Sequence, residues 1–414
     1  MTLLFAFVSV ILGPYLYRRV PIHFYPAISY VLKYLGGQLF DFERVRYAIM
    51  FQLAVLSVLM ILAIIKEGAP VLRESPFDLA FSRLSILFLL YVGLCTCWGV
   101  FSDNAVSQVV VDSYKFLEIP VLYTLFRISW RNTGAVRHGL TALSVIMLAL
   151  GLVEIFVTER GGVGLNLIIS IFPMTLLLLE KADKKRCVFM LLLLATSIVL
   201  LSKTRTYIIA FLLMLLLLVL FSPSGLRFGA ASRVALMFLM FLVVDFTTGG
   251  RIFAETAARF LELSRGFEVA GGYRAAEISV AIPFMRSHFL LGSGLGFVKT
   301  LYIEGMGVID WGGFIHNAYV EVFLKTGILG SIAAALLTIS LFILIGGNAK
   351  LSAVPNSAEI SLICRGAIIS ATSWLLIYAT APVSTFGSIF LGPLIAVVSI
   401  KCFYDCQNSG SVRQ

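Results

Sequence analysis

Residues 313–330 read GFIHNAYVEVFLKTGILG, and they join the one long polar segment of the chain to an apolar run. The polar segment, residues 249–313, carries six basic and six acidic side chains, whereas the other hydrophobic runs are separated by short loops. The apolar run, residues 326–347, is long enough to cross a bilayer, which needs roughly 17–25 residues. Because arginines, a glycine-rich turn and a histidine lie beside the bilayer here, we expect the functional site in this region.

The whole chain has the composition of a polytopic helical membrane protein. Hydrophobic residues make up 59%, charged residues 13%, and the mean hydropathy is +0.98. Apolar runs predict about twelve transmembrane helices, thirteen at most, at residues 2–17, 22–40, 46–65, 80–101, 105–126, 139–157, 163–179, 187–202, 205–221, 232–248, 326–347, 361–379 and 383–402. The doubtful run is 22–40, which contains Lys33 and crosses the membrane or lies at its surface. We predict an all-α membrane protein with a transmembrane bundle at 1–248, an extramembrane loop at 249–325, and further transmembrane helices with a short tail at 326–414.

The net charge of +10 comes mainly from loops, where an excess of lysine and arginine marks the cytoplasmic side. We therefore interpret it as a sign of topology and not of nucleic-acid binding. The predicted cytoplasmic loops contain Lys66 and Arg73; Arg127, Arg131 and Arg137; Lys181, Lys184, Lys185 and Arg186; and Arg227 and Arg233. The loops between them, including 249–325, are then external, and the carboxyl tail is inside. The side of the amino terminus depends on whether 22–40 crosses.

The long external loop predicts two amphipathic helices followed by a turn. The helices are expected at 252–267 and 273–291, on the membrane surface or over a cavity, with a kink at Pro283 in the second. The apolar stripe of the second helix is expected to contain Ile278, Ile282, Met285 and Phe289. The turn, 292–296, reads GSGLG and fits neither the P-loop nor the dinucleotide-binding pattern. We interpret it as a flexible, tight turn at the end of a helix.

Three arginines and one histidine are candidate functional residues on the external side. Arg160 and Arg205 are cations where the topology disfavours them, and Arg205 opens an apolar run. A charge at the membrane edge is a functional candidate, although an arginine there can also snorkel to lipid phosphate. Arg274 begins the second loop helix, where it either receives an anion or forms a surface pair with Glu277. His316 follows an aromatic and glycine stretch and begins a helical segment.

These positions carry a family resemblance. They are Ser202-x-x-Arg205, Arg274 and His316-Asn317-x9-Gly327-x-x-Gly330. Their order, spacing and shared side of the membrane, over about 160–345, resemble the O-antigen ligase and O-antigen polymerase superfamily of bacterial envelope enzymes. The amino-terminal third shares only the topology.

The resemblance implies a fold and an activity. Members of the superfamily are metal-independent, inverting glycosyltransferases with a fold like that of the GT-C class. They take a glycan from undecaprenyl diphosphate and attach it to a sugar hydroxyl at the periplasmic face of the inner membrane. No cofactor is implied, and the partners are the lipid-linked donor, membrane lipid, and either lipid A–core or a second glycan as acceptor.

The resemblance also implies roles for single residues. Arg205 and Arg274 would hold the diphosphate of the donor, because planar guanidinium groups suit two adjoining phosphates and stabilise the charge on the leaving group. Arg160 is a weaker addition to this anion-binding set. His316 would be the base for the acceptor hydroxyl, or would orient it, since imidazole titrates near neutral pH.

Four further positions would support the site. Asn317 and Glu321 would contact sugar, with the alternative that Glu321 pairs with Lys325. Gly327 and Gly330 would allow close helix packing that fixes the histidine.

Alternative functions remain open. A polymerase shares the donor chemistry but holds two lipid-linked chains, and the single dominant external loop favours ligation. A transporter or flippase is suggested by Asp112, Lys115 and Glu118 within one apolar run, although charges three residues apart can neutralise each other. A metal-dependent oligosaccharyltransferase is suggested by Asp41 and Glu43, whose carboxylates could hold a divalent ion with diphosphate.

Overall fold

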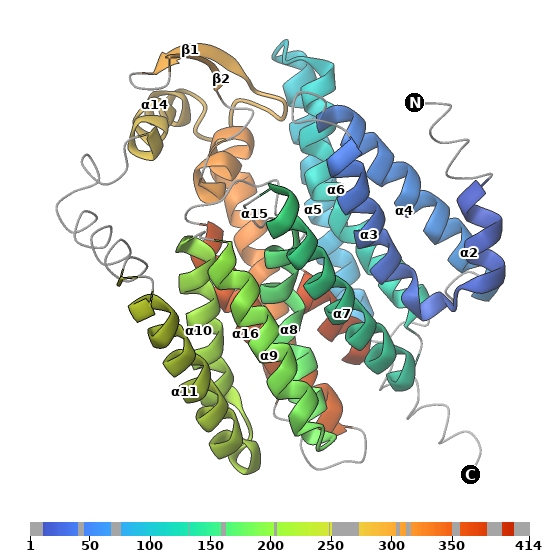
Figure 1. Ribbon diagram of the computed structural model, residues 1–414. Coiled ribbons are helices and arrows are strands. Elements are labelled where there is room, and N and C mark those ends of the chain that lie inside the picture. Colours follow the sequence, from blue (N-terminus) through green and yellow to red (C-terminus); the bar gives the residue numbers. More distant parts are fainter. Residues whose placement is uncertain are drawn as a thin grey trace.

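The computed structural model describes residues 11–39, 45–67, 76–130, 132–158, 163–202, 205–247, 249–250, 273–303, 307–311, 315, 317–349, 357–378 and 391–400. These residues form a bundle of long helices with a two-stranded sheet at one end (Figure 1). The elements are α2 (Gly13–Arg19), the 3-10 helix η2 (Ile22–Phe24), α3 (Tyr25–Leu39), α4 (Val45–Glu67), α5 (Pro76–Phe101), α6 (Val106–Ser129), α7 (Thr133–Thr158), α8 (Val163–Lys181), α9 (Lys185–Leu201), α10 (Arg205–Phe221), α11 (Ser224–Thr247), α14 (Tyr273–Ser287), β1 (Lys299–Ile303), β2 (Gly307–Trp311), α15 (Ala318–Ala349) and α16 (Ser357–Tyr378), followed by a helix at Leu391–Ile400.

The helices fall where the apolar runs predicted them, from α4 at the run 46–65 to α16 at the run 361–379. A helix is the expected form of such a run, because lipid offers no water to the backbone and a helix pairs its own N–H and C=O groups. Among the residues that the structure describes, three helices are long and apolar enough to cross a membrane: Gly134–Val153, Gly229–Thr247 and Ala318–Ala349. The helical class is therefore as predicted, and the total of about twelve crossings stays a prediction.

The outside of the bundle is apolar. Phe246, Ile343 and Leu90 expose 85%, 71% and 65% of their surface, and many other large apolar side chains point outward as well. Exposed apolar surface on this scale marks a membrane or partner contact. Together with the composition, it identifies the chain as a membrane protein.

The centre of the bundle is the close contact between α8 and α16. A Cβ atom on Gly366 of α16 would lie 2.6 Å from the Cα atom of Met174 in α8, so the two helices touch at their backbones. One turn on, Ser370 Oγ donates to the carbonyl oxygen of Ser170 at 2.8 Å, and Trp374 Nε1 donates to Ser170 Oγ at 2.8 Å. Small residues at the contact and hydrogen bonds across it are how membrane helices associate without a hydrophobic driving force between them.

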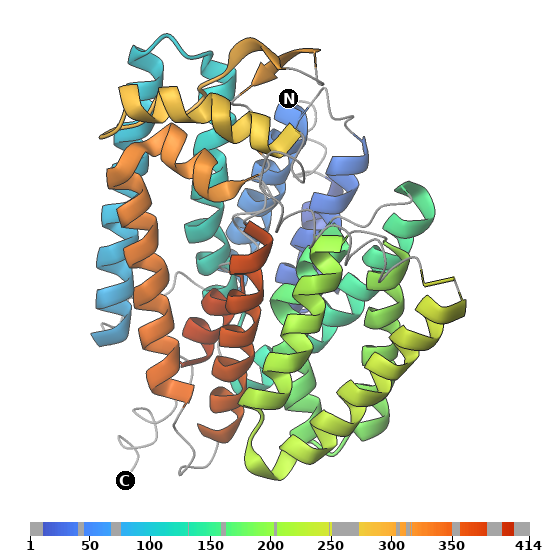
Figure 2. The same cartoon turned by 90° about the vertical axis from the view of Figure 1, so that its left-hand side faces the viewer.

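The two ends of the bundle differ. At one end, Arg233 of α11 pairs with Glu180 of α8 at 2.7 Å, and Arg365 of α16 donates to the carbonyl oxygen of Phe221 at 2.9 Å. The predicted cytoplasmic loops after α8 and α10 lie at this end. The sheet and α14 lie at the opposite end, where α14 crosses above the start of α15 (Figures 1 and 2). This arrangement fits the predicted alternation of loops, and the assignment of each end to a membrane face stays a prediction.

The long loop differs from the expectation of helices alone. β1 and β2 form an antiparallel hairpin, with Lys299 opposite Trp311 and Ile303 opposite Gly307. Strand pairing provides the backbone N–H and C=O groups of these residues with hydrogen-bond partners where no helix does so. The predicted helix 252–267 lies outside the described residues.

The predicted stripe of the second loop helix was wrong at Ile282 and Phe289, whereas Met285 packs inward as expected. α14 ends at Ser287, and Ile282 and Phe289 expose 41% and 52% of their surface. The side that packs carries Ala281, with Val280, Phe284 and Met285 beside it, and it rests on Ile315 and Leu324. Tertiary contact with the start of α15 therefore selects the buried face, which the weak periodicity of α14 does not define.

Candidate functional site

The predicted phosphate-binding arginines lie at the starts of helices. Arg205 is the first residue of α10, and Arg274 is the second residue of α14. Both helix starts lie at the end of the bundle opposite the connection between α10 and α11 (Figure 1). The side chains of Arg205 and Arg274 lie outside the described residues, as do Arg160 and His316. The structure therefore places two helix starts and leaves the mutual approach of these four side chains as a prediction.

The two neighbours of His316 in the chain are both fixed. Ile315 is fully buried in a small apolar cluster with Ala281 of α14 and Leu324 of α15. Asn317 caps α15: its Oδ1 accepts from the backbone N–H of Val320 at 3.1 Å. An asparagine cap stabilises a helix start by about 1 kcal/mol. The backbone on each side of His316 is thus held, by burial before it and by the cap after it.

α15 breaks at Gly327, whose φ of 66° and ψ of −169° are not helical. The break divides the helix into an N-terminal segment (318–326) and a longer segment (328–349), and Figure 2 shows the helix changing direction. A Cβ atom on Gly327 would lie 2.3 Å from the carbonyl oxygen of Leu290. Glycine is therefore needed for the left-handed backbone as well as for close packing.

The backbone groups freed by this break are paired with other parts of the site. Ser293 donates its N–H to the carbonyl oxygen of Leu324 at 2.7 Å, and Ile328 donates its N–H to that of Phe289 at 2.9 Å. Tyr91 of α5 donates its hydroxyl to the carbonyl oxygen of Thr326 at 2.6 Å. A helix that breaks in a buried position requires such partners, because a buried backbone group left unpaired costs about as much as a lost hydrogen bond.

Gly330 allows the close contact that its spacing suggested. A Cβ atom there would lie 2.7 Å from Cε1 of Tyr91 and 2.2 Å from Oγ1 of Thr326. The aromatic ring of Tyr91 therefore sits against the helix immediately after the break.

The glycine turn 292–296 follows the end of α14, as predicted, and is docked against other parts of the chain. Asn104, in the loop between α5 and α6, donates its Nδ2 to the carbonyl oxygens of Ser293 and Leu295 at 3.1 and 3.0 Å. Trp98 Nε1 donates to the carbonyl oxygen of Gly292 at 3.1 Å. Gly294 has a φ of 85°, and a Cβ atom on it would lie 2.6 Å from the Cα atom of Gly99. The turn therefore lies directly on the ends of α5 and α6.

Beneath the turn lies a closed ring of four buried charges, which we name the charge ring: Asp112 and Lys115 of α6, and Glu321 and Lys325 of α15. Its four ion pairs are Asp112–Lys115 at 2.9 Å, Lys115–Glu321 at 3.0 Å, Glu321–Lys325 at 2.9 Å and Lys325–Asp112 at 2.8 Å. Asp112 Oδ2 also accepts the N–H of Gly296 at 2.8 Å.

Helical spacing alone predicts two of the four ion pairs of the charge ring. The pair Glu321–Lys325 is the alternative stated for Glu321, and the pair Asp112–Lys115 is the mutual neutralisation expected within α6. The joining of the two pairs was missed, because 206 positions separate Lys115 from Glu321 and no local pattern connects them.

A groove of about 490 Å³ runs along α15 and faces α16. It begins at the N-terminal segment of α15 and continues past the break, and it is lined by Ala318, Tyr319, Val322, Phe323, Ser331, Ala334, Ala335, Thr338, Ile339, Phe342, Leu375 and Tyr378. Three of the hydroxyls that line it donate to backbone: Ser331 to the carbonyl oxygen of Gly327, Thr338 to that of Ala334, and Tyr319 to that of Leu375. The groove therefore offers an apolar surface.

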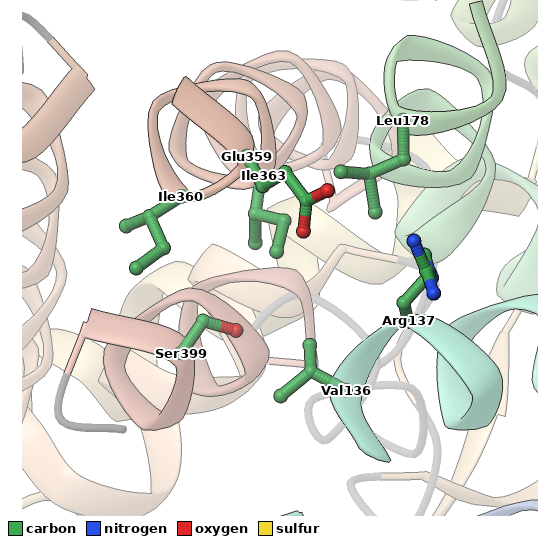
Figure 3. Close-up of a pocket in the computed structure, with 7 residues that line it drawn as sticks. All are labelled: Val136, Arg137, Leu178, Glu359, Ile360, Ile363 and Ser399. Carbon is green, nitrogen blue, oxygen red and sulfur yellow. The ribbon is translucent and has the colours of Figure 1, made fainter. Parts of the chain in front are cut away.

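A second pocket, at the end with the basic loops, holds about 10 Å³, which is room for one water molecule. It is lined by Val136, Arg137, Leu178, Glu359, Ile360, Ile363 and Ser399, with Arg137 and Glu359 pointing into it (Figure 3). This pocket is too small for a sugar.

Within the described ranges, no three histidine, cysteine, aspartate or glutamate side chains gather at metal-binding distance. Asp41 and Glu43, the predicted alternative ligands, lie outside those ranges.

These features define a helical membrane protein with a site built around a broken helix at one end. Residues 189–335 match the model of the O-antigen ligase family. The match confirms the resemblance to the O-antigen ligase and polymerase superfamily that the sequence showed over this region. The match covers about a third of the chain and includes Arg205, Arg274 and His316, while Arg160 precedes it. A comparison with curated proteins gave no match.

Proposed function

We propose that the chain transfers a glycan from undecaprenyl diphosphate to an acceptor sugar hydroxyl at the periplasmic face of the bacterial inner membrane. The acceptor in this proposal is lipid A–core, which makes the protein an O-antigen ligase. The observation that carries the proposal is the family match over residues 189–335, which encloses both helix-start arginines and the histidine before α15. Proteins of this family are glycan-transferring enzymes that act on lipid-linked substrates.

In the proposed reaction, His316 takes the proton of the acceptor hydroxyl as that oxygen attacks the anomeric carbon. The new glycosidic bond forms as the bond to the diphosphate breaks, so the configuration at this carbon inverts and undecaprenyl diphosphate leaves. Arg205 and Arg274 bind the phosphates and stabilise the negative charge on the leaving group. Guanidinium groups at helix starts suit this task, since the exposed N–H groups of a helix start attract anions as well. The reaction so written needs no metal ion.

The groove along α15 supports a substrate with a lipid chain. Its upper end is formed by Ala318 and Tyr319, which directly follow Asn317 in the chain. A donor whose diphosphate lies at the membrane surface must direct its isoprenoid chain into the bilayer beside the reacting groups. In our proposal the groove accepts that chain, because most of its lining is apolar and three of its hydroxyls already donate to backbone carbonyl oxygens.

The test is glycan transfer by the purified protein in lipid vesicles, with undecaprenyl-diphosphate glycan as donor. We expect transfer when lipid A–core is supplied as acceptor and none when the donor is supplied alone. Elongated lipid-linked glycan from donor alone would instead identify a polymerase. Absence of transfer under both conditions would refute the proposed function.

A further inference from the structure

We propose that Asp112, Lys115, Glu321 and Lys325, the charge ring, are positioning residues for glycan transfer. The ring holds the N-terminal segment of α15, and thereby His316 at its start, in the orientation that the reaction requires. The inference rests on the proposed function for the part that concerns catalysis. The part that concerns orientation stands on the structure alone and is measured separately.

The geometry of the ring makes it a lock between α6 and α15. Each charge has two neighbours of opposite sign, one on its own helix and one on the other helix. The four side chains expose 11% or less of their surface, and their formal charges sum to zero. A shift of α15 by one turn, about 5.4 Å, would break both pairs between the helices and leave buried charges without partners.

The N-terminal segment of α15 needs such a lock. The break at Gly327 separates it from the longer segment, so helix continuity does not set its direction. A single short helix is marginal by itself, because its stability comes from tertiary contact. Glu321 lies one turn after the cap Asn317, and Lys325 lies one turn further on. The ion pairs to α6 therefore contact the segment at two successive turns.

The ring is also tied to the glycine turn, because Asp112 accepts the N–H of Gly296. Within the same turn, Ser293 donates its N–H to the carbonyl oxygen of Leu324, at the far end of the N-terminal segment of α15. This segment is therefore attached to α6 in two ways: directly through the ion pairs, and through the glycine turn. Buried ion pairs are not needed for stability alone, because a protein with apolar residues of similar volume in their place is often as stable. Ion pairs also specify the orientation of the two helices, because any other register would leave buried charges without a partner of opposite sign.

The experiment removes all four charges at once, so that none is left buried without a partner. The ring variant combines Asp112→Asn, Lys115→Met, Glu321→Gln and Lys325→Met. Asparagine at 112 can still accept the N–H of Gly296. The matched control removes an ion pair between two different helices, Glu180→Gln with Arg233→Met, which joins α8 and α11 at the opposite end.

Two readouts are compared at equal abundance in the membrane. The first is the distance between spin labels on cysteines at Phe101 and Tyr319, which expose 82% and 49% of their surface, with the native cysteines replaced by serine. The second is the rate of glycan transfer, resolved into kcat and the KM for donor, and it is measured on unlabelled protein that keeps Phe101 and Tyr319. We expect the ring variant to broaden or shift the distance distribution and to lower kcat about 10–100-fold with KM unchanged, since small misplacements of reacting groups have effects of this size. The control variant should match the wild type in both readouts.

A ring variant with the wild-type distance distribution would overturn the orienting role of the ring. A ring variant with an altered distance distribution but the wild-type kcat would overturn the link between orientation and catalysis. If the ring variant does not insert, Lys115→Arg and Glu321→Asp decide, because they keep every charge but alter side-chain length. Lower kcat at unchanged KM in these variants supports the proposal, and wild-type kcat in both overturns it. If the wild type transfers no glycan, the proposed function fails, while the label distances still test the orienting role.

Discussion

Gly292 and Gly327 meet backbone to backbone: a Cβ atom on either would lie 2.5 Å from the backbone nitrogen of the other. Both have a left-handed backbone, with φ of 71° and 66°. The turn after α14 therefore crosses the break in α15 with no side chain between them. Because α14 begins with the Arg274 region and α15 follows His316, this contact connects the two parts of the proposed site.

Gly327→Ala is expected to disturb this contact more than any ordinary glycine substitution in the same helix. A non-glycine residue at this φ costs about 1–3 kcal/mol, and the added methyl group also meets the carbonyl oxygen of Leu290. We expect a lower midpoint of thermal unfolding in detergent and a loss of transfer. Gly346→Ala is the control, since a Cβ atom there has nothing within 4 Å. Equal unfolding midpoints for the two variants would contradict the strain assigned to Gly327.

The parts of the fold that the sequence predicted are those with a local physical cause. Apolar runs become helices because each run satisfies its own backbone in lipid, and the pairs Asp112–Lys115 and Glu321–Lys325 follow from helical spacing. The hairpin of β1 and β2 and the closure of the charge ring depend on contacts between distant residues. Gly327 was predicted to pack closely, while its left-handed backbone became visible only with the break in α15.

The groove along α15 yields a prediction about chain length. Ala335 lines the groove, so Ala335→Phe should fill part of it. We expect a higher KM for a donor with a full undecaprenyl chain and a smaller change for a donor with a short isoprenoid chain. The neighbouring Leu336 is 54% exposed and does not line the groove, so Leu336→Phe is the control. The same change in KM for both donors would show that the groove does not hold the chain.

The predicted topology can be tested with single cysteines in a background without native cysteines. Cysteines at Asp183, Phe228 and Lys350 should be shielded from a membrane-impermeant thiol reagent in intact cells, whereas one at Ala270 should react. The reason is the excess of lysine and arginine in the loops assigned to the cytoplasm. Labelling at 183 with protection at 270 would invert the orientation and place the proposed site on the cytoplasmic side.

The proposed diphosphate site predicts that lysine cannot replace its arginines. Arg205→Lys and Arg274→Lys keep the charge but lose the planar, two-pronged hydrogen bonding that suits adjoining phosphates. Each variant should insert normally and lose most of its transfer activity. Arg286→Lys, in the last turn of α14, should transfer at the wild-type rate. If the Arg205 and Arg274 variants match this control, the two arginines do not bind the leaving group.

The proposed base, His316, is tested by His316→Ala. The variant should insert and bind lipid-linked donor, but transfer should fall by about 10²–10⁴, the usual effect of removing a general base. His288→Ala is the control, because His288 lies on the exposed end of the α14 region and bonds to Ser287 Oγ at 2.9 Å.

A base must be neutral to accept a proton, so wild-type transfer should decline as pH falls through the titration of imidazole. EDTA should leave the rate unchanged. Full activity of His316→Ala would remove the catalytic role, and EDTA inhibition reversed by Mg²⁺ or Mn²⁺ would favour a metal site at Asp41 and Glu43 instead.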